Sequence, residues 1–267
     1  MKKIIKGITP LFLALIILMD SSVLYGQEII KEGDKVKDKL YIAVIIDDFG
    51  NQMAGTDAIA NLPIPITGAV IPGMPFAKED ATKLHDAGKE VILHVPLEGF
   101  KSKPSWLGPK GITTGMKPEK VKLILEASLV EIPYAVGMNN HMGSRAMQDK
   151  KIVNTLMEFA KEKDLYFVDS KTYDIKIAQE IAKENHTTYM IRDVFLDNTP
   201  STQHVIKQLQ EALKVAKEKG YAIVIGHVGP QKGPHTAAAL KAMIPKLQAE
   251  NVEFVTVSTL THRLHGQ

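Results

Sequence analysis

Carboxylates and imidazoles recur along this 267-residue sequence at the points where apolar runs end. Asp47 ends the run YIAVIID and Asp48 follows it directly. Two adjacent carboxylates repel each other in a dry cleft unless one is protonated, paired or bound to a cation. His94 and His141 end or follow two further runs, and an aspartate with two histidines suits zinc or a similar divalent ion. These residue types therefore predict a metal site with a coordination position left for water.

A site of this kind has a defined chemistry. A divalent ion lowers the pKa of bound water and polarises a carbonyl group, and a second carboxylate beside it can take the water's proton. His227, which ends the run YAIVIG, is the candidate to protonate a leaving amine if it faces the metal. Further candidates for binding substrate or ordering the site are Glu98, Trp106, Asn140, Ser144, Asp169 and Arg192.

Structural roles compete with each of these functional ones. An Asp-Asp pair after a strand is often a turn or a helix cap. Arg192 can pair with the adjacent Asp193 in a purely structural ion pair. Trp106 can serve only to pin the loop in which it lies. The argument for function therefore depends on several such residues meeting in one place.

Composition narrows the chemistry further. The sequence contains no cysteine, which excludes disulfides, thiolate zinc sites and a cysteine nucleophile, so a metal must be held by His, Asp or Glu. The formal net charge of +3 is too balanced to indicate a nucleic-acid partner. The sequence shows no G-x-S-x-G motif of a serine hydrolase, and it does not define an oligomeric state.

The N-terminus resembles an export signal over residues 1–26. Three lysines fall within the first six residues, and a short apolar run from Leu11 to Met19 follows them. That run is shorter than the roughly 20 apolar residues of a membrane span. We expect a signal peptide cleaved after Gly26, or alternatively an uncleaved anchor that would be the chain's only membrane contact. Residues 27–39 are charged and indicate a solvated tether. We expect residues 40–267 to form the folded domain. An export signal would place this domain outside the cytoplasm, as a secreted, periplasmic or wall-associated protein.

From residue 40 onward, apolar β-branched runs alternate with amphipathic stretches. The predicted strands are 41–47, 66–71, 90–95, 135–140, 165–169, 187–192, 221–226 and 252–257. Helices are predicted over 117–131, 149–163, 202–219 and 234–249. Pro118 marks the start of the first and Asp149 can cap the second. Ser201 or Thr202 can cap the third, which ends at Gly220, and Pro234 opens the fourth. This alternation predicts an α/β fold, a (β/α) barrel of seven or eight parallel strands, with a doubly wound open sheet as the alternative. The candidate site residues follow strands, and barrels of this class build their sites at that end of the strands.

The motifs VIIDDFG, HVPLE, NNHMGS, FVDS and IGH, followed by FVTVSTL, occur in this order. Together they resemble the divergent polysaccharide deacetylase family, a distant relative of the NodB-type carbohydrate esterases, from about Tyr41 to the C-terminus. The resemblance implies a NodB-like barrel, a glycan substrate and metal-dependent removal of acetyl groups. It also implies that Asp47 is the base, that Asp48 binds metal along with two histidines, that His227 is the general acid, and that Asp169 supports the acid or base network.

Two motifs depart from the NodB pattern. Its H-x-x-x-H spacing here gives His94 and Glu98, so we assign the second histidine ligand to His141 and keep Glu98 as the alternative ligand. The Arg-Pro-Pro-Tyr-Gly motif is missing, which favours a second hypothesis, a non-catalytic envelope domain that binds glycan or a partner protein. Asp47 and His227 favour catalysis, because a pure binding protein needs neither. The sequence thus predicts an exported metal-dependent hydrolase acting on an N- or O-acetylated polysaccharide or cell-wall glycan.

Overall fold

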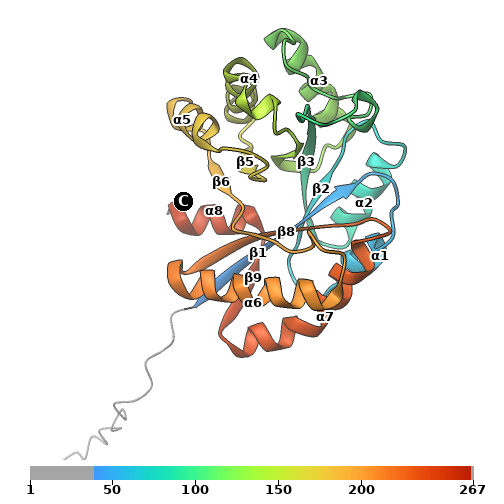
Figure 1. The fold of residues 1–267 in the computed structure, drawn as a ribbon, viewed down its shortest axis with the longest axis vertical. Coiled ribbons are helices and arrows are strands. Elements are labelled where there is room, and N and C mark those ends of the chain that lie inside the picture. The colour runs from blue at the N-terminus through green and yellow to red at the C-terminus, as the bar shows by residue number, and fades with distance from the viewer. Residues whose placement is uncertain (1–38, 266–267) are drawn as a thin grey trace, which may run out of the picture. The chain divides into compact units, whose positions relative to one another are not determined.

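The computed structural model describes residues 39–265 (Figure 1). The predicted export signal (1–26) and all but the last residue of the predicted tether (27–39) lie outside the described residues. Among the helices that the structure describes, none has the length and apolar character needed to cross a membrane.

The centre of the fold is a curved sheet in which every strand pairs in parallel. The strands are β1 (Leu40–Phe49), β2 (Thr67–Val70), β3 (Glu90–Leu97), β4 (Ala135–Met142), β5 (Tyr166–Asp169), β6 (Tyr189–Ile191), β7 (Val194–Phe195), β8 (Tyr221–His227) and β9 (Val252–Val255). Their order is β6-β5-β4-β3-β2-β1-β8-β7, and β9 pairs with the start of β1. The (β/α) barrel class predicted from the sequence is confirmed.

The barrel is incompletely closed. The two ends of the strand order, β6 and β7, are consecutive in the chain with only residues 192–193 between them, yet no ladder joins them among the described strands. All eight predicted strands are present. The two-residue β7 was not predicted, because so short a segment has no periodicity to detect.

Helices cover the outside of the sheet (Figure 1). They are α1 (Thr56–Ala60), α2 (Ala77–Asp86), α3 (Pro118–Glu131), α4 (Lys150–Glu162), α5 (Lys176–Glu184), α6 (Thr202–Lys219), α7 (Gly233–Ala249) and α8 (Val257–His265), with short 3₁₀ turns at Pro104–Trp106 and Ala146–Gln148. The four predicted helices are confirmed as α3, α4, α6 and α7. Asp149 caps α4 by accepting a 3.0 Å bond from the backbone N–H of Lys151, and Gly220 ends α6 at φ 86°. Helices α1, α2 and α5 were not predicted, because Gly55, Phe76 and Ile175 at their N-cap positions are not the Ser, Thr, Asp or Asn that marks a helix start, and no Pro opens their first turn.

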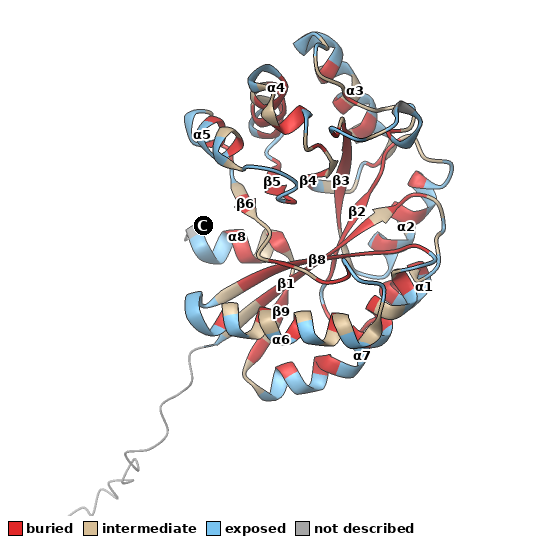
Figure 2. Ribbon diagram, in the orientation of Figure 1, coloured by how far each residue is buried: buried red, intermediate tan, exposed pale blue. Residues whose placement is uncertain are grey.

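Strand alternation divides the core into two layers. In β1, Ile42, Val44 and Ile46 pack outward against the helices, whereas Ala43 and Ile45 point into the barrel. All five side chains are fully buried. The helices bury only the face that meets the sheet and leave the other to solvent (Figure 2). The inner layer fills the barrel below its C-terminal mouth, and the inward positions at the strand ends are therefore the ones that line that mouth.

Candidate metal centre

Inward alternation brings polar side chains to the mouth of the barrel. Asp47 is two residues beyond Ile45 in β1, His94 is two beyond the inward Ile92 in β3, and His227 is two beyond the inward Ile225 in β8. Asp47 and His227 are paired directly in the register of β1 and β8. Residues two apart in a strand face the same side of the sheet, so these side chains face the interior, as the core residues before them do.

Asp48 breaks this alternation, and the break is what places it in the site. Consecutive strand residues normally face opposite sides of a sheet. Asp48 adopts φ 69°, in the left-handed region that a non-glycine residue seldom occupies, and the register between β1 and β2 shifts between Ile46 and Phe49. This irregularity turns Asp48 to the same side as Asp47. Backbone strain of this kind is concentrated at functional sites.

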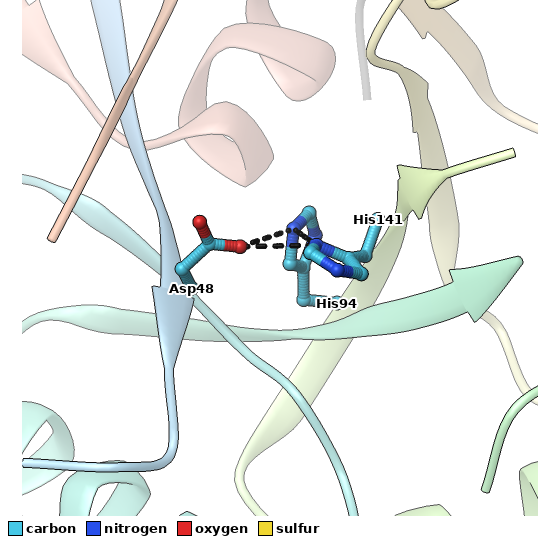
Figure 3. A group of neighbouring side chains, drawn as sticks. All are labelled: Asp48, His94 and His141. Carbon is cyan, nitrogen blue, oxygen red and sulfur yellow. Dashed lines mark hydrogen bonds and ion pairs between the residues drawn. The ribbon is translucent and has the colours of Figure 1, made fainter. Parts of the chain in front are cut away.

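Asp48, His94 and His141 meet at one point, from β1, β3 and β4 (Figure 3). The Asp48 Oδ1 atom lies 3.3 Å from Nε2 of His94 and 3.0 Å from Nδ1 of His141. The two ring nitrogens are 3.1 Å apart. Among the described residues, these three are the His, Asp or Glu side chains grouped closely enough to share a metal ion.

The three donor atoms fit a divalent ion. Ligand atoms about 2.1 Å from a tetrahedral zinc ion are roughly 3.4 Å from one another, close to the separations observed here. Asp48 Oδ1 is buried without a geometrically aligned hydrogen-bond donor, an arrangement that a bound cation would satisfy. A carboxylate oxygen and two imidazole nitrogens are also a donor set that zinc accepts.

Asn139 fixes the chemical form of His94. The Asn139 amide donates to Asp47 Oδ1 at 2.8 Å, and its Oδ1 lies 2.7 Å from Nδ1 of His94. Because an amide oxygen can only accept, His94 carries a proton on Nδ1, so in the neutral ring the lone pair is on Nε2, the atom nearest to Asp48 and His141. Asn139 thus links the buried Asp47 to a metal-binding tautomer of His94, a type of support common around metal ligands.

The two adjacent carboxylates differ in acidity. Burial raises the pKa of Asp47, against the opposing effects of His94 and His227. Burial also acts to raise the pKa of Asp48, but the neighbouring imidazoles of His141 and His94 outweigh it and hold that pKa well below its ordinary value. Environments that push two carboxyl pKa values apart are typical of a site in which one group exchanges protons and the other stays charged.

Asp197, which our sequence analysis missed, orients His227. The Asp197 carboxylate is fully buried and accepts from the His227 backbone N–H at 2.7 Å, from its Nδ1 at 2.8 Å and from Thr236 Oγ1 at 2.9 Å. Burial acts to raise the pKa of Asp197, but the bond and charge of His227, together with Lys232 and Thr236, outweigh it and lower that pKa. With Nδ1 engaged, Nε2 is the nitrogen of His227 left for substrate. Asp197 follows the unpredicted β7, so no strand-end argument pointed to it.

Glu98 lies outside the group of three. Its Oε2 accepts from the backbone N–H of Thr114 at 2.8 Å and from the Thr114 hydroxyl at 2.7 Å, and its Oε1 accepts from Arg145 at 2.9 Å. The hydroxyl bond of Thr114 is the main cause that lowers the pKa of Glu98. The structure therefore assigns Glu98 a contact that ties the long loop after β3 to the segment after β4.

Two of the other predicted residues, Asp169 and Asn140, bond to the framework of the barrel. Asp169 is buried and accepts from Tyr189 Oη and the Lys171 N–H, and within the described chain no hydrogen bond or ion pair joins it to the candidate metal ligands. Asn140 is bonded to the backbone, donating to Met142 O and accepting from the Ser170 N–H. The structure therefore places Asp169 and Asn140 in the framework around the mouth of the barrel.

Arg192 lies nearer to the site. Its Nε donates to Ser170 O at 2.9 Å, and its guanidinium is 5.0 Å from the ring centroid of Phe195, which in turn contacts His227. Burial lowers the pKa of Arg192, opposed by the charge of Asp47. Arg192, which follows β6 directly, therefore brings a cation within electrostatic range of the buried carboxylate.

Trp106 and Ser144 line a hollow of about 260 Å³ beside β4. Met142, the residue after His141, lines it too. These two predicted substrate contacts therefore lie together, on the β4 side of the site.

The geometry can be compared with known proteins. The family described as divergent polysaccharide deacetylase matches residues 44–261 of this sequence. The chain belongs to the divergent polysaccharide deacetylase family. All of the candidate site residues named above lie within the matched residues. A relative of the chain is the uncharacterized protein YibQ of Escherichia coli (strain K12), 31% identical over 219 residues. That alignment covers 82% of this chain and 66% of YibQ, just under two thirds of its length.

Solved structures share the fold of this deacetylase-family chain. An uncharacterized protein of Agrobacterium tumefaciens C58, ATU2773, has a TM-score of 0.77 at 22% identity, covering 83% of this chain and 89% of that one. A mutant of BA3943, a CE4 family pseudoenzyme with restored enzymatic activity, has a TM-score of 0.51 at 15% identity, covering 84% and 68%, and the wild-type protein is from Bacillus anthracis. At these identities the similarity shows the NodB-like barrel, and function has to be argued from the site.

Proposed function

We propose that this chain is an extracytoplasmic, metal-dependent deacetylase of an N- or O-acetylated glycan. The observation that carries the proposal is the convergence of Asp48, His94 and His141 on one point, beside the buried carboxylate of Asp47. His227 is paired with Asp47 in the strand register and completes a set with one base and one acid. Membership of the family supports acetyl groups of a polysaccharide as the target.

Asp48, His94 and His141 would hold the ion, and two imidazoles with one carboxylate favour zinc. When bound, a divalent ion supplies Lewis-acid polarisation of the acetyl carbonyl and acidifies water. The protein's own part is to keep Asp48 charged and His94 in the tautomer that offers Nε2, and Asn139 performs the second task.

Asp47 and His227 have complementary roles in moving protons. Asn139 occupies Oδ1 of Asp47, which leaves Oδ2, 3.7 Å from His94 Nε2, directed at the site. Because burial raises its pKa, Asp47 accepts a proton from water more readily than an ordinary aspartate. In its imidazolium form His227, held through Nδ1 by Asp197, would donate the Nε2 proton to the leaving amine or alcohol.

Acetate release tests this proposal directly. Zinc-loaded protein would be incubated with two probes, the N-acetylglucosamine tetramer and O-acetylated xylotetraose. We expect release from at least one, and a fall in kcat of about 10²- to 10⁴-fold in Asp47→Asn and in His227→Ala. Asp57→Asn, which changes a carboxylate that is 76% exposed, is the matched control and should keep wild-type activity. Full activity in Asp47→Asn would contradict the assigned base.

The second candidate is a glycan-binding envelope domain without turnover. It is favoured by the missing Arg-Pro-Pro-Tyr-Gly motif, and a CE4 family pseudoenzyme has a similar fold. Under this hypothesis the zinc-loaded chain binds both probes but releases no acetate, and Asp47→Asn leaves the affinity unchanged. The acetate assay and a parallel binding titration therefore separate the two functions.

A further inference from the structure

The exposed aromatic rings of the protein lie at one end of the barrel. Among the described residues, the phenylalanine, tyrosine and tryptophan side chains that are exposed are Phe76, Phe100, Trp106 and Tyr173. Each belongs to a segment that follows the C-terminal end of a strand, namely β2, β3 or β5. Aromatic rings bury a large apolar area when they pack, so their collection at one end indicates a surface that another body covers.

Two of these rings form an exposed apolar tip. Phe100 and Tyr173 are 57% and 53% exposed, and they meet edge to face with centroids 5.3 Å apart and planes at 64°. Neither ring lines the hollow beside β4. The backbone N–H of Phe100 donates to Ser144 Oγ at 3.1 Å, and Glu98 holds the base of the same loop through Thr114. Because these contacts already order the loop, the ring is presented at little further cost in conformational entropy.

Lysines are interspersed with the rings along the same loops. Residues 99–117 contain four lysines and no aspartate or glutamate. Lys101 and Lys103 are exposed in this stretch, and Lys171 is exposed in the loop after β5, where Asp174 is an exposed carboxylate. The exposed side chains of these two loops are therefore both aromatic and, in sum, positively charged.

This combination is complementary to the surface of a lipid bilayer. Tryptophan and tyrosine favour the headgroup region, where the ring meets apolar chains and its polar group stays hydrated. Lysine stems can lie along apolar surface while their ammonium groups reach lipid phosphates, and anionic lipids attract them. The 64° angle between Phe100 and Tyr173 leaves no shared flat face on which a sugar ring could stack. Separate loop tips can enter lipid one by one.

We infer that the loop-tip surface, formed by Phe100, Lys101, Lys103, Trp106, Lys171 and Tyr173, docks the barrel on a bilayer that contains anionic phospholipids. The sequence predicted a membrane contact only through the N-terminal signal, and this surface is a second one, at the mouth of the barrel. The inference goes beyond the proposed function and does not depend on a bound metal.

Trp106 reports on this surface, since it is the only tryptophan in the sequence and is 54% exposed. Full-length protein would be mixed with vesicles of brominated phosphatidylcholine, with or without phosphatidylglycerol, while tryptophan emission is recorded. We expect a blue shift and quenching by the brominated chains with the mixed vesicles, and less of both with phosphatidylcholine alone or at high salt. Binding through the N-terminal segment alone would leave Trp106 in water and give neither signal.

Variants of the loops identify the groups that bind. Phe100→Ser and Tyr173→Ser should each weaken binding to mixed vesicles about tenfold. Lys101→Gln and Lys103→Gln should each weaken it about fivefold.

Two variants away from the loops are the matched controls. Leu264→Ser removes a 43% exposed apolar side chain from α8, a helix whose first N–H bonds to Thr67 and Glu90 at the starts of β2 and β3, the other end of the barrel. Lys241→Gln removes an exposed charge from α7. Both should bind vesicles as wild type does.

The other outcomes overturn the inference. Vesicle binding with unshifted and unquenched Trp106 emission would show that another part of the chain meets the lipid. No binding to mixed vesicles, in protein that melts as a folded domain, would overturn it as well. Emission that responds to the N-acetylglucosamine tetramer but not to vesicles would assign the rings to a glycan instead.

Discussion

At the scale of single residues, the position of Asp48 depends on a carboxylate in a different element. Asp80, in α2, is fully buried, and its Oδ2 accepts from the backbone N–H groups of Gly50 at 2.7 Å and Gln52 at 3.1 Å. Both donors lie in the turn that follows Asp48, and Gln52 is itself at φ 48°. Asp80 therefore stabilises the irregular backbone that turns Asp48 toward the histidines.

Removing Asp80 should weaken both the fold and the metal site. In Asp80→Ala the two backbone N–H groups lose their acceptor, which should lower the free energy of unfolding by about 1–3 kcal/mol. Denaturant titration measures this change, and calorimetric zinc titration should show weaker binding. Asp86→Asn, at an exposed position of the same helix, is the control. Unchanged zinc affinity in Asp80→Ala would show that the turn keeps its shape unaided.

Asp197 should give the protein a defined acid sensitivity. A carboxyl whose folded pKa is lowered stabilises the fold above its unfolded pKa of about 3.9, and this contribution is lost as pH falls through the folded value. Asp197→Asn should thus be less stable than wild type by about 1–3 kcal/mol at pH 7. In melting curves from pH 7 to pH 3, the difference should shrink below about pH 4. A difference independent of pH would mean that the charge of Asp197 contributes nothing.

The residue scale also sets the limit of sequence-based prediction. Asp48, His94 and His141 could be predicted together because all three end or follow strands, and parallel strands bring their ends to one face. The role of Asn139 could not, since it depends on a side-chain bond between neighbouring strands. Asp197 was missed for a different reason, because it follows β7, a strand of two residues that has no periodicity to detect.

At the scale of elements, the long loop after β3 is the least regular part of the site and the most closely tethered. The backbone of Ile112 bonds to Pro96 O and to the Glu98 N–H, which continues the β3 edge into the loop. Glu98 adds its two bonds to Thr114. The sequence over 99–116 is rich in Gly, Pro and Lys and holds the only tryptophan, but it gives no sign of these contacts.

Glu98→Ala should loosen this loop without releasing metal. Hydrogen exchange of residues 99–116 should become faster, because Thr114 loses its acceptor, while zinc content stays at the wild-type level. Glu119→Ala, at an exposed position of α3, should change neither quantity. Loss of zinc from Glu98→Ala would revive Glu98 as a ligand.

At the scale of the whole molecule, β1 is the element on which the site depends. It pairs with β2, β8 and β9, and its buried alternation continues into Asp47. The barrel class followed from the alternation of strands and helices, because parallel strands require crossovers. The gap between β6 and β7 could not be predicted, since it reflects pairing between strands of only two or three residues.

The metal content of the purified chain tests the central claim most directly. Elemental analysis would compare wild type with His94→Ala, His141→Ala and Glu98→Ala after zinc loading and desalting. The structure predicts about one zinc per chain in wild type and Glu98→Ala, and loss of that zinc in both histidine variants, because each removes one of three converging donors. Wild-type protein that is folded yet retains no zinc, manganese, cobalt or nickel would contradict the account at its centre.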